Sequence, residues 1–177
     1  MRLAHQRPAQ VAGLISQNGN AYEDGLSPAW DPVRKYWKDP STENRDALRG
    51  LLSLEGIRWQ YEHGAPSAES IAPETYTLDH SLISRDGVID LQLDLILDYA
   101  SNVRAYPDFQ TYFRTYRPRT LVIWGDKDPF FLPQGALAFA RDNPDAVIEL
   151  LDTGHFALET HGAHIARRIK NVFTGAR

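Results

Sequence analysis

The sequence predicts an α/β fold with a parallel sheet that is interrupted by a long helical region. Three short apolar runs, residues 11–16 (VAGLIS), 120–125 (TLVIWG) and 146–152 (AVIELLD), have the length of strands buried on both faces. The second and third alternate with helical patterns, LPQGALAFARD and ALETHGAHIARRIKNVF, in the order strand, helix, strand, helix. Such alternation predicts parallel strands joined by right-handed crossovers, with helices on both faces of the sheet.

The first elements along the chain are the end of a helix, a turn at Pro8 and the strand at residues 11–16. Residues 19–117 show no clear strand pattern and are predicted to form a helical region. One helix is expected to start at Ser27 with Pro28 in its first turn, and another to run from Ser41 to near Gly64.

A third helix of this region carries Leu91, Leu95, Tyr99 and Val103 at helical spacing. The region is also rich in aromatic residues, because it holds all eight tyrosines and three of the four tryptophans. These rings either pack within the helical layer or face a ligand pocket.

Composition restricts the function. The chain has 177 residues, 42% of them hydrophobic and 24% charged, which is enough for one compact core. A net charge of −4 gives no basic surface for nucleic acid, and no apolar run is long enough to span a membrane. The start, MRLAHQRPAQ, has no apolar segment typical of a secretory signal, so we expect a cytoplasmic protein. The absence of cysteine excludes thiolate chemistry.

Two polar residues follow the two C-terminal strands. Asp128 comes after the strand at 120–125, and His155 comes after the strand at 146–152. The carboxyl ends of parallel strands meet at one edge of a sheet, so we expect the two side chains to be neighbours. A carboxylate can hold an imidazole in one tautomer while the other ring nitrogen accepts a proton, which is a catalytic arrangement. The alternative for each residue is structural: Asp126 and Asp128 would cap the next helix, and His155 would be a loop residue. Gly125 and Gly154 are expected to give the backbone freedom for tight exits.

The segments TLVIWGDKDPFF and LLDTGHFALE resemble the C-terminal third of the α/β-hydrolase family. In that family an acid follows the seventh strand and a histidine follows the eighth, and these places match Asp128 and His155. Some members carry the acid after the sixth strand instead, but residues 16–20 here read SQNGN and offer only amides. The resemblance implies a partial α/β-hydrolase fold with its last three strands in the order 6-7-8.

The same resemblance divides the chain into domains. Residues 1–18 and 118–177 correspond to the C-terminal part of the hydrolase core, and residues 19–117 correspond to a helical cap. The cap is similar to that of the haloalkane dehalogenase and epoxide hydrolase branch. It implies a hydrolase for a small apolar haloalkane, epoxide or ester, with no cofactor. The candidate pocket residues are aromatic residues of the cap: Trp30, Tyr36, Trp37, Trp59 and Tyr99.

The chain departs from the family pattern because it contains no G-x-S-x-G or G-x-D-x-G segment, and therefore no nucleophile. The HGAP segment at 63–66 has the form of an oxyanion-hole loop, but it follows a helical stretch and is interpreted as a cap loop. Met1 would lie just beyond the nucleophile, so the sequence is expected to be N-terminally truncated and inactive alone. In-frame upstream codons for the missing motif would support this reading.

The strand at 11–16 would have an open edge, through which the chain would self-associate. The alternative to an enzyme is a non-catalytic remnant that binds a small molecule or a protein through its aromatic cap. His155, Glu159, His161 and His164 lack the H-E-x-x-H form, so no metal site is predicted.

Overall fold

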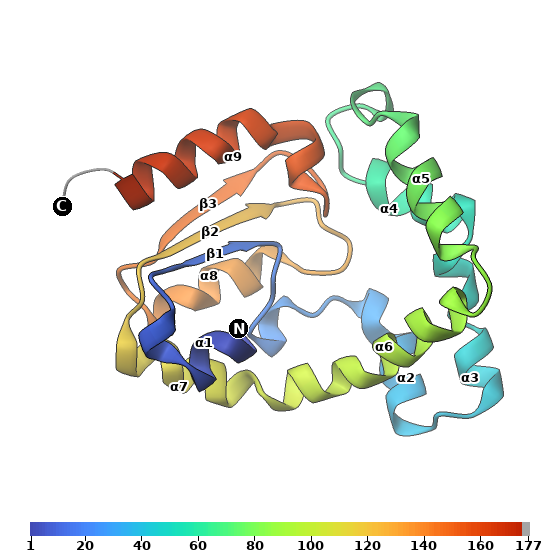
Figure 1. Ribbon diagram of the computed structural model, residues 1–177, viewed down its shortest axis with the longest axis horizontal. Coiled ribbons are helices and arrows are strands. Elements are labelled where there is room, and N and C mark those ends of the chain that lie inside the picture. The colour runs from blue at the N-terminus through green and yellow to red at the C-terminus, as the bar shows by residue number, and fades with distance from the viewer. Residues whose placement is uncertain (175–177) are drawn as a thin grey trace.

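The computed structural model describes residues 1–174 and contains one parallel sheet of three strands in the order β1-β2-β3 (Figure 1). The strands are β1 (Leu14–Gln17), β2 (Thr120–Gly125) and β3 (Val147–Leu151). Leu14 lies opposite Thr120, and Leu121 lies opposite Val147. The predicted α/β class, the parallel pairing and the strand order are therefore confirmed.

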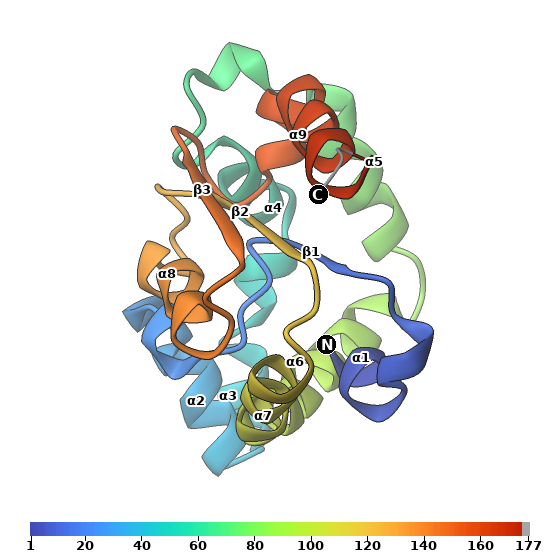
Figure 2. The same ribbon diagram turned by 90° about the vertical axis from the view of Figure 1, so that its left-hand side faces the viewer.

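Both faces of the central strand β2 are covered, and all six of its residues are buried as a result. On one face, Val122 and Trp124 pack with α8 (Pro133–Asp142) and α7 (Tyr106–Tyr116). On the other face, Leu121 and Ile123 pack against α9 (Ala157–Thr174). Figure 2 shows α8 and α9 on opposite sides of the strands. A short helix, α1 (Arg2–Gln6), packs on α7.

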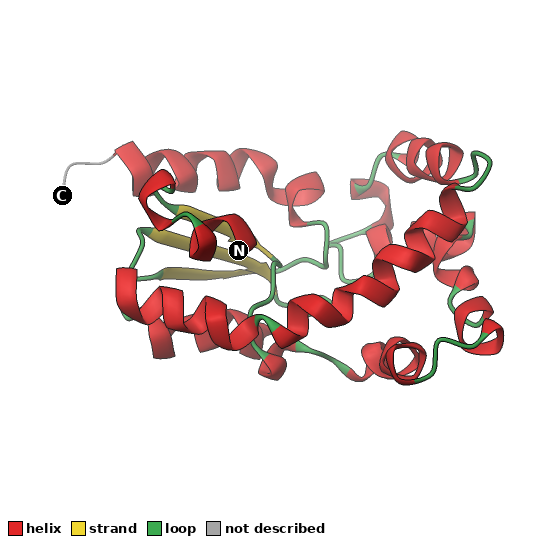
Figure 3. Cartoon of the chain, turned by 60° about the horizontal axis from the view of Figure 1, so that its bottom comes forward, coloured by secondary structure: helices red, strands yellow, loops and turns green. Residues whose placement is uncertain are grey.

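The other helices lie beyond the carboxyl ends of the strands, on the right of Figures 1 and 3. Their buried residues form two clusters. One consists of Val33, Tyr36, Leu48 and Leu93, and the other of Ile57, Tyr61 and Ile71. Residues 19–117 contain helices and turns, and Leu26 forms an isolated bridge with Phe131 outside that range. The α-helices of this group are α2 (Asp31–Lys38), α3 (Thr42–Asp46), α4 (Leu54–Glu62), α5 (Pro73–Ile83) and α6 (Val88–Arg104).

Three local predictions differ from the structure. The first strand begins at Leu14 and not at Val11, because a 3₁₀ turn at Pro8–Gln10 and a bend precede it. Ser27 does cap a first turn, through a bond from the Ala29 N–H, but that turn is 3₁₀ and leads into α2.

The predicted continuous helix from Ser41 to Gly64 is wrong. It is divided into α3, a 3₁₀ turn at Arg49–Leu52, and α4. Ser53 caps α4 through its side chain, and Gly56 lies so close to the Gly50 carbonyl that a Cβ there would be 2.1 Å away. The cap at Ser53 starts a new helix, and the close approach of Gly56 to Gly50 holds the two helices apart in the chain at this break.

In α6 the predicted apolar stripe is only partly buried. Leu91 and Leu95 are each 55% exposed, whereas Leu93 is fully buried against the core of the helical group. α9 bends at His161, whose φ of −123° is not helical. Within residues 1–174, no helix combines the length and the apolar character needed to cross a membrane.

Candidate active site

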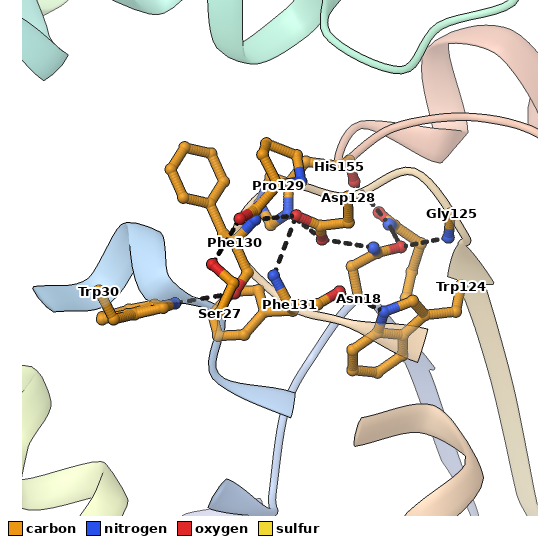
Figure 4. A network of polar contacts seen from close by, with 11 residues as sticks. Asn18, Ser27, Trp30, Trp124, Gly125, Asp128, Pro129, Phe130, Phe131 and His155 are labelled. Atoms are coloured by element: carbon orange, nitrogen blue, oxygen red, sulfur yellow. Dashed lines mark hydrogen bonds and ion pairs between the residues drawn. The ribbon is translucent and has the colours of Figure 1, made fainter. Parts of the chain in front are cut away.

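Asp128 and His155 meet at the edge where β2 and β3 end. Oδ2 of Asp128 lies 2.7 Å from Nδ1 of His155 (Figure 4). The Asp128 side chain is fully buried, and the His155 side chain is 25% exposed. Because a carboxylate only accepts hydrogen bonds, Nδ1 carries the proton and Nε2 of the neutral ring is the acceptor.

The Asp128 carboxylate accepts four hydrogen bonds. Oδ1 accepts from the backbone N–H groups of Phe130, at 2.7 Å, and Phe131, at 3.1 Å. Oδ2 accepts from His155 and from Nδ2 of Asn18, which is 2.5 Å away. Asp128 thus shapes the turn that follows β2 and also holds the imidazole. It does not cap the next helix, because α8 follows Leu132 and has no side-chain cap hydrogen bond.

The glycines at the strand exits are required by close packing. A Cβ on Gly125 would lie 2.0 Å from the Gly154 carbonyl oxygen, and a Cβ on Gly154 would lie 1.9 Å from the His63 carbonyl oxygen. Neither glycine has a positive φ, so the expected need for backbone freedom is wrong. The glycines allow the turns after β2 and β3 to touch, and this brings Asp128 and His155 together.

An apolar cavity of about 340 Å³ adjoins the pair. His155 forms part of its wall, together with Phe130 and Phe131 from the turn after β2. The helical group supplies most of the remaining wall, through residues of α2, α4, α6 and the turns beside them. The polar groups of that wall, besides His155, are the side-chain amides of Gln60 and Gln92, the hydroxyl of Tyr99 and the indole N–H of Trp30. The cavity therefore fits a mainly apolar small molecule placed against the imidazole.

The structure separates the five predicted pocket residues into two groups. Trp30 and Tyr99 line the cavity, and their rings lie 4.9 Å apart. Tyr36 instead packs in the core of the helical group, and Trp37 donates its indole N–H to the Ile96 carbonyl at 2.8 Å. Trp59 is 44% exposed and packs beside His63, outside the cavity wall.

Sequence reasoning missed several residues of the site. Phe130 and Phe131 follow Asp128 in the DPFF segment, and this position directly after the acid could have identified them as residues of the site. Asn18 was visible as an amide at the end of the first strand, where it donates to Asp128. Gln60 and Gln92 gave no signal, because their position depends on how the helices pack.

No group of three or more histidine, aspartate or glutamate side chains among residues 1–174 is arranged to hold a metal ion. His164 instead bonds Glu149 at 2.5 Å, and His161 contacts the Thr160 hydroxyl at 2.8 Å.

A three-stranded parallel sheet with an acid and a histidine after adjacent strands defines an α/β protein with an acid–histidine pair at its ligand-binding edge. The model of the family described as alpha/beta hydrolase fold matches residues 1–162. The chain is also 40% identical over 176 residues to an uncharacterized hydrolase of Saccharomyces cerevisiae, covering 97% of this chain. The chain therefore belongs to the α/β-hydrolase family.

Solved structures show the same fold at low sequence identity. The chain matches 2-hydroxy-6-oxo-6-phenylhexa-2,4-dienoate hydrolase from Rhodococcus sp. strain RHA1 with a TM-score of 0.69 and 13% identity, over 98% of this chain and 59% of that one. It matches Cfl2 from Burkholderia cenocepacia with a TM-score of 0.70 and 16% identity, over 96% of this chain and 60% of that one. The chain spans 61% of the length of the yeast relative.

Proposed function

We propose that this chain carries the acid and the base of a hydrolase that acts on a small, mainly apolar organic substrate. The observation that supports this most strongly is the 2.7 Å contact between Asp128 and His155 beside the apolar cavity. Nε2 of His155 has no hydrogen-bond partner among the described residues, so it can accept a proton.

The chemistry needs a nucleophile, and no G-x-[SD]-x-G segment that would carry one in this family occurs in the 177 residues. With an ester, a serine supplied from outside these residues would give its proton to His155 as it attacks the carbonyl, and the imidazolium would return that proton to the departing alcohol, which leaves an acyl intermediate. His155 would then take a proton from water, the hydroxide would attack the acyl carbon, and the proton would pass to the serine oxygen as the acid is released. Asp128 would stabilise the imidazolium that forms in this step.

The helical group serves in this proposal as a cap, with residues 19–117 as its range. Support comes from the cavity wall, most of which belongs to the helical group. The cap would bind the apolar part of the substrate and exclude water from the imidazole.

Hydrogen bonding within the cap favours an ester over a haloalkane. A halide could be held by an indole N–H, but Trp30 donates its N–H to the Phe130 carbonyl at 3.0 Å. Trp37 likewise donates its indole N–H to the Ile96 carbonyl. An ester needs no indole donor from the cap, because its reacting carbonyl is served by the nucleophile and an oxyanion hole.

An epoxide depends on Tyr99, the tyrosine in the cavity wall. Its hydroxyl has a long contact of 3.5 Å with the Tyr106 hydroxyl. Burial raises the pKa of Tyr99 above its ordinary value, so the hydroxyl stays protonated and can donate to an epoxide oxygen. An epoxide is therefore the second candidate substrate.

A panel of aromatic esters, epoxides and haloalkanes tests this proposal. It is assayed on the 177-residue chain and on the chain extended by any in-frame upstream codons for G-x-[SD]-x-G. We expect ester hydrolysis by the extended chain and none by the chain alone. Turnover by the chain alone, above a His155→Ala control, would show that a nucleophile lies within these residues. Binding of the panel without turnover by either chain would favour a binding protein.

A further inference from the structure

Asn18 occupies an unusual backbone position directly after β1. Its φ is +48°, in the left-handed region that non-glycine residues seldom adopt, although asparagine tolerates it better than most. The residue is 2% exposed, and the next residue is a glycine. A glycine would satisfy this backbone conformation with less strain, so the presence of a side chain here calls for a separate reason.

The side-chain amide of Asn18 spans the turn between β2 and the acid. Oδ1 accepts a hydrogen bond from the backbone N–H of Gly125 at 2.9 Å, and Nδ2 donates to Oδ2 of Asp128 at 2.5 Å. This orientation is fixed by chemistry, because an N–H group needs an acceptor and a carboxylate needs a donor. A single side chain therefore ties the last residue of β2 to the carboxylate three residues later (Figure 4).

The contact from Asn18 differs from the other three contacts of the carboxylate. Two of those come from Phe130 and Phe131, which belong to the turn of Asp128 itself. The third comes from His155, the group that the carboxylate has to hold. Asn18 alone links the carboxylate directly to the sheet through a side chain.

The neighbouring residue extends this arrangement to the histidine. Nε2 of Gln17 donates to the His155 carbonyl at 2.8 Å and to Oδ1 of Asn18 at 2.6 Å. The carboxyl end of β1 thus contacts both the acid and the backbone of the base.

We infer that Asn18 is a positioning residue, whose amide holds the Asp128 carboxylate in the orientation that fixes the Nδ1–H tautomer of His155. The inference deepens the proposed function, because it assigns a residue that supports the acid–histidine pair. It concerns the geometry of that pair, and it can be tested without a substrate.

The test uses the 177-residue chain with ¹⁵N-labelled histidine. Two-bond ¹H–¹⁵N spectra report which ring nitrogen carries the proton in the neutral imidazole, and a His155→Gln variant assigns the signal. We expect the Nδ1–H tautomer to dominate in the wild type. Asn18→Gly keeps the left-handed backbone but removes both amide contacts, and we expect a mixture of the two tautomers.

A second buried asparagine provides the matched control. Asn143 is fully buried, and its amide donates to the Pro118 carbonyl at 2.8 Å and to the Thr120 hydroxyl at 3.1 Å, at the other end of β2. Asn143→Gly is expected to lower stability and leave the His155 tautomer unchanged. If Asn18→Gly fails to fold, Asn18→Ala replaces it, because this change also removes both amide contacts.

An unchanged Nδ1–H tautomer in either folded Asn18 variant would overturn the inference. Because the readout needs no turnover, a failure of the proposed hydrolase activity would leave this result intact and would be recognised separately.

Discussion

Oδ2 of Asp128 lies 2.7 Å from Nδ1 of His155, although the two residues are 27 positions apart in the sequence. The parallel order of β2 and β3 brings their exits to one edge, and two glycines let the exits touch. The pair then faces an apolar cavity that is built largely by the helical group.

The cavity is tested by filling it from α6. Leu95 lines the cavity and Leu91 does not, yet both are 55% exposed, which makes them a matched pair. Leu95→Trp should take up part of the space and weaken binding of an aromatic ester about tenfold, or about 1.4 kcal/mol. Calorimetric titration measures this. Leu91→Trp should bind as the wild type does, and equal affinity in both variants would mean that the ligand binds elsewhere.

The close contact between the strand exits is tested by adding a methyl group. Gly125→Ala would place a Cβ 2.0 Å from the Gly154 carbonyl and should lower the free energy of unfolding by about 1–3 kcal/mol or more. Chemical denaturation measures the loss. Gly162→Ala is the control, because nothing lies within 4 Å of its added Cβ in α9, and it should gain about 0.5–1 kcal/mol. A Gly125→Ala protein of unchanged stability would show that the exits do not pack as described.

The open edge of β1 is expected to cause self-association. α9 covers β2 and β3 but leaves Ile15 49% exposed, and β1 pairs on one side with β2 alone among the described strands. Ile15→Lys should reduce association, because a lysine on an edge strand opposes pairing with another chain. Sedimentation velocity at several concentrations compares it with Leu137→Lys, which changes a leucine of α8 that is 54% exposed. A wild-type chain that stays monomeric throughout would contradict the prediction.

Glu149 links β3 to α9, the two elements on either side of His155. Burial acts to raise the pKa of Glu149, but hydrogen bonds from Arg168 and His164 outweigh it and lower the pKa below its ordinary value. A lowered pKa stabilises the fold above the unfolded-state pKa, and this stability is lost as the pH falls through the folded-state pKa.

Glu149→Gln should therefore lower the free energy of unfolding by about 1 kcal/mol at neutral pH. The difference from wild type should shrink as the pH falls below the ordinary glutamate pKa of roughly 4.3 and then through the lower folded-state pKa of Glu149. Thermal unfolding across pH measures both effects, with Glu159→Gln on the exposed side of α9 as the control. A difference that persists at low pH would point to packing as its cause.

The sheet and the acid–histidine contact could be predicted from sequence because they depend on local patterns. Near-continuous apolar runs identified β2 and β3, and the direction of parallel strands placed Asp128 beside His155. The break in the predicted helix between Ser41 and Gly64 could not be predicted from local patterns, because it depends on the contact of Gly56 with Gly50.

The cavity wall was predicted only in part for the same reason. Tyr36 and Trp37 have the aromatic character of pocket residues, but the rotation of α2 directs them into the helical core and toward Ile96. In the sequence, Asn18 indicated only that no carboxylate follows the first strand. In the structure, its side-chain amide donates a hydrogen bond to Asp128. These roles depend on packing between distant segments, which residue spacing does not encode.

The most direct test of the account compares Asp128→Asn with Asp126→Asn in the chain extended by any in-frame upstream codons for G-x-[SD]-x-G, using kcat for the best ester of the panel. Asp126 is exposed and two residues away, so its variant makes the same chemical change outside the pair. We predict that Asp128→Asn lowers kcat roughly 10⁴-fold, because an amide cannot hold the Nδ1–H tautomer or stabilise the imidazolium, while Asp126→Asn stays near wild type. Near-normal turnover in Asp128→Asn would contradict the account and leave Asp128 with a structural role only.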